Sequence, residues 1–252
     1  MILYKYLPAA RIDVLEKALI RFSPPWVFND PFECLPQWVR RGPTPRSPWT
    51  RYVKRMLAAN PRNLEAEVKQ QSHLGYLRTH FSDLGILALS RDPKNILMWG
   101  HYTECHRGFV IGFEVADGRF IKQCKRIEPV RYTDARSVLS RDWQLRAPFR
   151  KSRAWAYEKE WRAIAPMSEA DEVVGPLWGS LKLFSFSRTC VSSVIVGYAA
   201  PQKFQTTLGE LIRETYKGAQ LYRSVLDRRR FRMQLIKIPR WEGLALRRPV
   251  GT

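Results

Sequence analysis

Short stretches typical of β-strands recur along most of the chain, and this pattern most constrains its fold. Strands are expected at 2–7, 85–91, 109–115, 127–134, 160–166, 181–187, 191–198 and on both sides of the "RRR" at 228–230. Helical spacing is expected at 11–20, 49–59, 64–79, 95–106 and 201–217. Because the helices are concentrated in the first half, the pattern predicts an α+β fold and not repeated βαβ units.

The size and composition of the chain favour one globular domain. It has 252 residues, of which 45% are hydrophobic, and it contains nine Trp, ten Tyr and twelve Phe, which is too many for a disordered protein. We expect a single domain over 1–240. Within it we expect a helical insertion at about 43–82, which begins with a proline-rich linker. Residues 241–252 are expected to form a basic C-terminal tail.

The charge of the chain points to an anionic partner. Lys and Arg number 43 and Asp and Glu 23, which gives 43 − 23 = +20. Such a surface concentrates polyanions around it. Nucleic acid, either DNA or RNA, is the expected partner, and an anionic membrane surface, a phosphate-rich cofactor or a generically basic protein are the alternatives. A protein acceptor also stays open.

The cysteines and the apolar runs favour a cytoplasmic protein. The four cysteines are scattered without the spacing of a zinc site, so we expect no metal. The first residues lack the pattern of a signal peptide, and no run of about 18 apolar residues is present. A reduced compartment and no membrane span are therefore expected.

Four polar segments remain once common nucleotide and hydrolase fingerprints are found absent. In the first, a strand would place Tyr4 and Tyr6 on one face and Lys5 on the other. The simpler interpretation is that the tyrosines are core residues and the lysine is solvated. In the second, Asn29 and Asp30 precede Pro31 and are also typical of an ordinary turn.

The third segment joins the end of a strand to the start of a helix. It carries Ser90 and Arg91, followed by Trp99, His101 and Tyr102. A helix start offers unpaired N–H groups and a positive dipole, which suit a phosphate. The alternative is that the histidine simply lies on a helix surface.

The fourth segment, "AWAYEKEWRAIAP" at 154–166, places two acids among aromatic residues. In a strand beginning near Lys159, Glu160 and Arg162 share one face, and Glu158 lies on the loop or one strand step back. A carboxylate beside aromatic rings has a raised pKa unless a cation or hydroxyl pairs with it. Ordinary ion pairs with Lys159 and Arg162 are the structural alternative.

Four motifs together resemble a known family. They are "LYKY", "FNDPFE", "MWGHYTECHRGFVIGFE" and "WAYEKEWRAI", which span roughly residues 1–200. In this order they resemble the bacterial and phage domain-of-unknown-function family numbered twenty-nine seventy-one.

That family in turn resembles the ADP-ribosyltransferase fold. The likeness rests on a Tyr-bearing first strand, on a strand that ends at Ser90 and leads into a helix, and on Glu160 at the start of a late strand. Lys5 stands where that fold usually has His or Arg. The resemblance implies an ADP-ribosyltransferase-like split β-sheet core with the helical insertion in its N-terminal half.

The resemblance also implies NAD as a substrate. Glu160 is the expected catalytic carboxylate, because breaking the nicotinamide–ribose bond develops oxocarbenium character that a carboxylate stabilises. Glu158 is expected to activate the acceptor. The residues expected to contact NAD are Tyr4, Lys5, Tyr6, Asn29, Asp30, Ser90, Arg91, Trp99, His101 and Tyr102.

The expected function is an NAD-dependent ADP-ribosyltransferase that modifies a macromolecule, with nucleic acid first, as a toxin, defence or phage effector. One alternative is a basic nucleic-acid-binding module without enzymatic activity. The other is an inactive protein that keeps the transferase fold for interactions.

Overall fold

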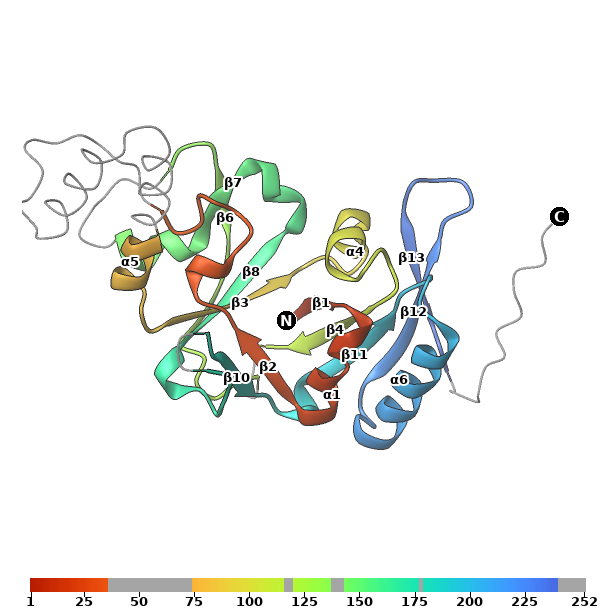
Figure 1. The fold of residues 1–252 in the computed structure, drawn as a ribbon. Helices are drawn as coiled ribbons and strands as arrows, with labels where there is room; N and C mark the ends of the chain where they lie inside the picture. Colours follow the sequence, from red (N-terminus) through yellow and green to blue (C-terminus); the bar gives the residue numbers. More distant parts are fainter. Residues whose placement is uncertain (36–73, 116–119, 137–142, 177–178, 240–252) are drawn as a thin grey trace, which may run out of the picture.

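The structure is a computed structural model and describes residues 1–35, 74–115, 120–136, 143–176 and 179–239. Its main element is an eight-stranded sheet (Figure 1). From one edge to the other the strands are β13 (Met233–Lys237), β12 (Gln220–Leu226), β11 (Val191–Val196), β4 (Phe109–Glu114), β1 (Ile2–Leu7), β3 (Leu84–Ser90), β8 (Glu160–Pro166) and β5 (Arg126–Pro129). Only β11 and β12 are parallel neighbours in this sheet, within the described part of the chain.

Two smaller sheets accompany the large one. The first contains β2 (Leu19–Phe22), β10 (Leu181–Ser185) and β9 (Glu172–Val174), and the second pairs β6 (Arg131–Thr133) with β7 (Arg150–Ser152). A bridge between Ser23 and Ile86 connects the end of β2 to β3.

Helices are short apart from one. They are α1 (Asp13–Lys17), a helix at 74–80, α4 (Ile96–Tyr102), α5 (Trp143–Arg146) and α6 (Gln202–Thr215). Short 3₁₀ helices include η2 (Pro25–Val27), η3 (Ala147–Phe149) and η4 (Arg153–Glu158). The long helix α6 makes the crossover that the parallel pair β11 and β12 requires. The α+β class is confirmed, since helices and strands do not alternate regularly.

Three groups of buried side chains hold these elements together. The largest includes fully buried Leu3, Phe109, Phe113 and Val194 from the large sheet. A separate group links α4 to β1 and to the pair β12–β13, and we call it the aromatic cluster. Its members are Tyr6, Met98, Trp99, Val110, Ile195 and Met233, with Tyr4, Tyr102, Tyr157, Tyr222 and Leu235 packed against them.

The helix expected at 11–20 is shorter than predicted. α1 ends at Lys17, and Ala18 adopts a left-handed conformation with φ of 53°. The chain then enters β2, where Ile20 is buried against the core. The apolar residues at 19 and 20 fit a helical period by chance and instead belong to a strand, because tertiary pairing overrides the local pattern.

The single strand expected at 127–134 is wrong. β5 ends at Pro129 and β6 begins at Arg131 in a different sheet. The last contact with β8 is the hydrogen bond from the N–H of Val130 to the carbonyl of Glu160, at 2.9 Å, where β8 begins. The chain then pairs with β7 instead, so the segment belongs to two sheets.

Part of the expected organisation lies outside the described residues. This is true of 43–73 of the helical insertion, including the helix expected at 49–59, and of the tail at 241–252. Among the described residues, no helix has the length and apolar character needed to cross a membrane.

Candidate active site

Three neighbouring strands bring the sequence motifs into one row. In the register of the sheet, Tyr4 on β1 lies opposite Ser90 on β3, and Ser90 lies opposite Glu160 on β8. These residues come from three separate motifs, yet they follow one another across adjacent strands. The row ends where β8 begins, so its polar groups face one end of the sheet.

A cavity of about 200 Å³ opens over this row. Of the residues expected to bind NAD or to be catalytic, those that line it are Tyr4, Lys5, Tyr6, Asn29, Asp30, Ser90, Tyr102, Glu158 and Glu160. Glu33, Lys151 and Trp155 line it as well. The aromatic first strand, the "FNDPFE" loop and the acidic pair therefore share one cavity wall.

Three of the expected residues lie elsewhere. Trp99 is fully buried in the aromatic cluster, where its Nε1 donates to the carbonyl of Pro93 at 2.9 Å. A side chain with no exposed face cannot stack on a ligand, so its expected role is corrected to a core residue. Arg91 and His101 are exposed and do not line this cavity.

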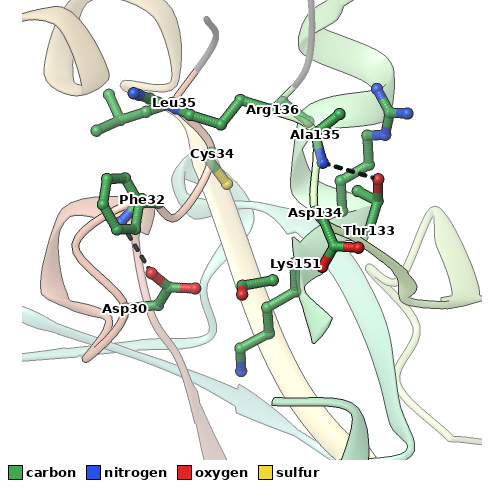
Figure 2. Close-up of a pocket in the computed structure, with 12 residues that line it drawn as sticks. Asp30, Phe32, Cys34, Leu35, Thr133, Asp134, Ala135, Arg136 and Lys151 are labelled. Carbon is green, nitrogen blue, oxygen red and sulfur yellow. Dashed lines mark hydrogen bonds between the residues drawn. The ribbon is translucent and has the colours of Figure 1, made fainter. Parts of the chain in front are cut away.

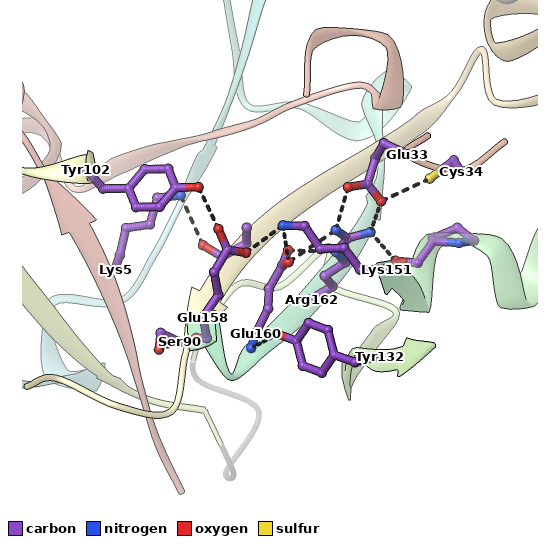
Figure 3. Close-up of polar contacts among 12 residues, drawn as sticks. Lys5, Glu33, Cys34, Ser90, Tyr102, Tyr132, Lys151, Glu158, Glu160 and Arg162 are labelled. Carbon is purple, nitrogen blue, oxygen red and sulfur yellow. Dashed lines mark hydrogen bonds and ion pairs between the residues drawn. The ribbon is translucent and has the colours of Figure 1, made fainter. Parts of the chain in front are cut away.

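The acidic pair belongs to a buried network of ion pairs (Figure 3). Arg162 is fully buried and donates to both oxygens of Glu33, at 2.6 and 3.0 Å. It also donates to both oxygens of Glu160, at 2.7 and 3.2 Å. Lys151 Nζ then joins Glu160, at 2.9 Å, to Glu158, at 2.5 Å. The ion pair expected between Glu160 and Arg162 is thus present, whereas Lys159 pairs with Asp92 at 2.8 Å.

The network contains more acids than bases. Glu33, Glu158 and Glu160 are its three acids, and Arg162 and Lys151 are its two cations. Burial raises the pKa of Glu33, against the attraction of Arg162. Burial alone would raise the pKa of Glu160, but attraction to Arg162 and Lys151 outweighs it and lowers this pKa to about 2. Glu160 is therefore charged at neutral pH, and it is a buried residue that lines the first cavity.

A tight turn aims both acids at Lys151. Lys159 adopts a left-handed conformation with φ of 45°, between the end of η4 and the start of β8. Ser90 Oγ donates to the carbonyl of Glu158 at 2.7 Å, and the side-chain amide of Asn95 donates to the carbonyl of Tyr157 at 2.7 Å. The strand end and the helix start of the third motif thus hold this turn in place.

Two tyrosines support the acids directly. Tyr102 Oη donates to Glu158 Oε1 at 2.7 Å, and burial together with this hydrogen bond raises the pKa of Tyr102. On the other side, the Glu160 N–H donates to Tyr132 Oη at 2.7 Å. Burial raises the pKa of Tyr132 to about 12. Both phenols stay protonated at neutral pH and fix the position of the acids.

Lys5 is not the solvated residue that the simpler interpretation expected. Its Nζ donates to the carbonyl of Ala88 at 3.0 Å and lies on the side of the network shown in Figure 3. Burial lowers its pKa to about 8, although the charge of Glu160 opposes the shift.

A second cavity, of about 230 Å³, adjoins the first (Figure 2). Asp30 and Lys151 line both cavities, and Phe32, Thr133 and Arg136 line only the second. Within the described part of the chain, the buried Nε and Nη2 of Arg136 have no hydrogen-bond partner. The region beside the acidic pair therefore has space on both sides of Lys151.

Sequence reasoning missed three members of the site. Lys151 lies in a run of basic residues, 150–153, that has the composition of a solvated surface. Glu33 lies inside the "FNDPFE" motif, but only the fold shows that it faces Arg162. Tyr132 lies in a segment expected to be plain strand. Of these three residues, only Glu33 carried a sequence signal, because it lies inside a recognised motif.

Comparisons with known proteins give limited matches. An Xaa-Pro dipeptidase of Serratia proteamaculans (strain 568) is 36% identical over 83 residues, which cover 31% of this chain and 18% of that protein. The match therefore spans less than a fifth of the dipeptidase. No solved structure matches the chain.

One family matches the middle of the chain. Residues 98–163 match the family described as "Protein of unknown function (DUF2971)". The matched segment runs from α4 through β4 into β8, so it carries Tyr102, Glu158 and Glu160 of the candidate site but not Glu33. Over this segment the chain is thus similar to the family that its sequence motifs resemble, and that expectation is confirmed.

Proposed function

We propose that this chain is an NAD-dependent ADP-ribosyltransferase, with an ADP-ribosyltransferase-like core, that modifies nucleic acid. The observation that carries the proposal is the row formed by Tyr4, Ser90 and Glu160 on three adjacent strands. Each of these residues lies in one of the three sequence features on which the resemblance to that fold rests. Their meeting at one cavity supports a common site for the cleavage of NAD.

The charge of the network suits this reaction. Cleavage of the nicotinamide–ribose bond develops positive charge on the ribose, and a fixed carboxylate stabilises such a charge without having to reorganise. The ion-pair network contains three acidic side chains and two cations, and both Glu158 and Glu160 line the first cavity. Glu160, anchored by Arg162, is the proposed carboxylate beneath the ribose.

Glu158 is the proposed base for the acceptor. In the transfer, the bond from ribose to nicotinamide breaks and its electron pair leaves with nicotinamide. The nucleophilic atom of the acceptor forms the new bond, and its proton passes to Glu158. Tyr102 and Lys151, which both contact this carboxylate, hold it in position. The second cavity gives the acceptor group a place beyond Lys151.

The volume of the first cavity limits which part of NAD could lie inside it. Its volume of about 200 Å³ is below the ~300–1,000 Å³ that is usual for ligand pockets. It would accept the nicotinamide and its ribose beside Tyr4 and Tyr6. The adenosine half would then lie across the open mouth of the cavity.

The test is release of nicotinamide from NAD by purified variants. With an acceptor oligonucleotide present, we expect Glu160→Gln, which removes the charge beneath the ribose, and Glu158→Gln, which removes the base, each to lower the rate at least about 100-fold. Glu172→Gln, at an exposed position on β9, is the matched control and should keep the wild-type rate. Circular dichroism confirms that each variant is folded. Rates within about threefold of wild type in both site variants, well under 1 kcal/mol of barrier, would refute the assignment.

A non-enzymatic role is the second candidate. It is favoured by the three hydrogen bonds that the oxygens of Glu160 accept from Lys151 and Arg162, which already engage this carboxylate within the protein. This candidate predicts that the wild-type protein binds NAD or nucleic acid but releases no nicotinamide. Calorimetric titration with NAD alongside the rate assay distinguishes the two.

A further inference from the structure

The loop between β12 and β13 is short, basic and organised by one acid. Its sequence at 227–232 is "DRRRFR". Asp227 Oδ1 accepts the N–H groups of Arg229 and Arg230, at 2.9 and 3.1 Å. Asp227 Oδ2 accepts Arg232 Nε and the side-chain amide of Gln234, each at 2.6 Å. One carboxylate therefore fixes the path of the whole loop.

The side chains that this loop presents are directed to solvent. Arg228, Arg229 and Arg230 are exposed, and Phe231 is exposed over 105% of its reference area. The loop carries four arginines and one aspartate, which gives 4 − 1 = +3. A fully exposed Phe gives up the free energy that burying its apolar surface would provide. Proteins that bind single strands combine aromatic rings that stack on bases with basic residues that contact phosphates, and Phe231 among arginines has this arrangement.

The two strands of the hairpin pack against residues of the candidate site. Tyr222 on β12 and Met233 and Leu235 on β13 belong to the aromatic cluster, which also contains Tyr4 and Tyr102 from the wall of the first cavity. In Figure 1 the hairpin rises beside α4, the helix that carries Tyr102. One packed layer thus connects the loop to the cavity.

We propose that the hairpin loop 227–232 binds single-stranded nucleic acid, with its arginines on phosphates and Phe231 stacked on a base. Stacking needs a base with an open face, and the cavity beside the aromatic cluster has room for an extruded base and not for a duplex. A membrane-inserting tip would need an apolar surface around Phe231. Its immediate neighbours are Arg230 and Arg232.

We further infer that the loop holds the bound nucleic-acid strand next to the candidate active site. This part of the inference rests on the proposed function, because it makes the bound strand the acceptor. Binding by the loop does not depend on catalysis, so the two can be tested apart.

The experiment measures fluorescence anisotropy of a labelled oligonucleotide of about 20 nucleotides at several salt concentrations. The triple variant Arg228→Gln, Arg229→Gln, Arg230→Gln should weaken binding at least tenfold and reduce the salt slope by about 2, at about 0.7 per phosphate contact in single strands. Phe231→Ala should weaken binding at least about fivefold and leave the salt slope unchanged, because stacking is not ionic. Phe231→Tyr keeps a stacking ring and should restore wild-type affinity.

A matched triple variant controls for net charge. Lys203→Gln, Arg213→Gln and Lys217→Gln remove three exposed cations in or just after α6, away from the loop. Binding within about threefold of wild type is expected, because more distant charges are largely screened. Equal weakening by the two triple variants, or no effect of Phe231→Ala, would overturn the proposal. So would loop variants that lose binding to anionic phosphatidylserine vesicles while oligonucleotide binding stays intact.

Nicotinamide release by the same variants separates this inference from the proposed function. The loop variants should release nicotinamide from NAD at the wild-type rate while losing oligonucleotide binding. If the wild-type protein releases no nicotinamide but binds the oligonucleotide through Phe231, the transferase proposal is refuted and the proposed binding by the loop still stands. If the wild-type protein releases nicotinamide but its oligonucleotide binding does not depend on the loop, the loop proposal is refuted and the transferase proposal still stands.

Discussion

Arginine has opposite roles in two regions of this molecule. In the candidate site, Arg162 is fully buried and its guanidinium is shared between Glu33 and Glu160. In the hairpin loop, Arg228, Arg229 and Arg230 are exposed. The single acid of the loop, Asp227, accepts two backbone N–H groups, Arg232 Nε and the Gln234 side-chain amide, and none of the guanidinium groups of those three arginines.

The contrast shows how neighbours decide what a charge does. A buried arginine must satisfy its hydrogen bonds inside the protein, so it stabilises the carboxylates around it and has little capacity left for a ligand. An exposed arginine on a fixed backbone keeps its donors for phosphates. The overall charge of +20 does not distinguish the two.

The largest expected effect comes from removing the buried arginine. Arg162→Met should lower the free energy of unfolding by about 3–5 kcal/mol, because Glu33 and Glu160 would stay buried without their cation. Urea denaturation measures this loss. The matched variant Arg229→Met, in the exposed loop, should stay within about 0.5 kcal/mol of wild type. A loss below about 1 kcal/mol for Arg162→Met would show that the two regions do not differ as described.

The next effect is a pH dependence of stability. The pKa of Glu160 falls from 4.5 to about 2 on folding, so its contribution is complete above pH 4.5 and is lost as the pH falls towards 2. At about 1.36 kcal/mol per pKa unit, the loss is about 3 kcal/mol at most. Urea denaturation of wild type and Glu160→Gln at pH 5 and pH 3 measures it. Identical pH dependence in both proteins would contradict the role of Glu160.

The smallest effect concerns the hairpin alone. Asp227→Ala removes the acceptor of the Arg229 and Arg230 N–H groups, so hydrogen exchange of these two amides should accelerate. The melting temperature should not change measurably, because the loop lies outside the core. Unchanged protection of both amides would show that the loop is ordered by something other than Asp227.

Much of the fold follows from sequence patterns. The strands expected at 2–7 and 109–115 match β1 and β4 almost residue for residue. β4 is buried along nearly its whole length between β1 and β11. The errors fall where a short element depends on distant partners. The apolar pair at 19 and 20 is strand because β10 pairs with it, and Pro129 ends β5 where the sequence continues to alternate.

The candidate site was predictable only in part. Glu158, Glu160 and Ser90 lie in motifs, and the expected strand face placed Glu160 beside Arg162. Lys151 was not predictable, because β7 reaches the acids only through its pairing with β6. Trp99 was misjudged for a related reason: an aromatic residue in a motif gives the same signal whether it faces a ligand or the core.

The position of β1 has a consequence for how the chain acquires its structure. Its two partners in the sheet, β3 and β4, are translated much later, so Leu3 and Tyr6 stay uncovered on the nascent chain until residues as late as Glu114 leave the ribosome. Pairing across such long separations slows folding and exposes apolar surface in the meantime. This protein should therefore fold late during its synthesis and benefit from chaperones that shield its first strand.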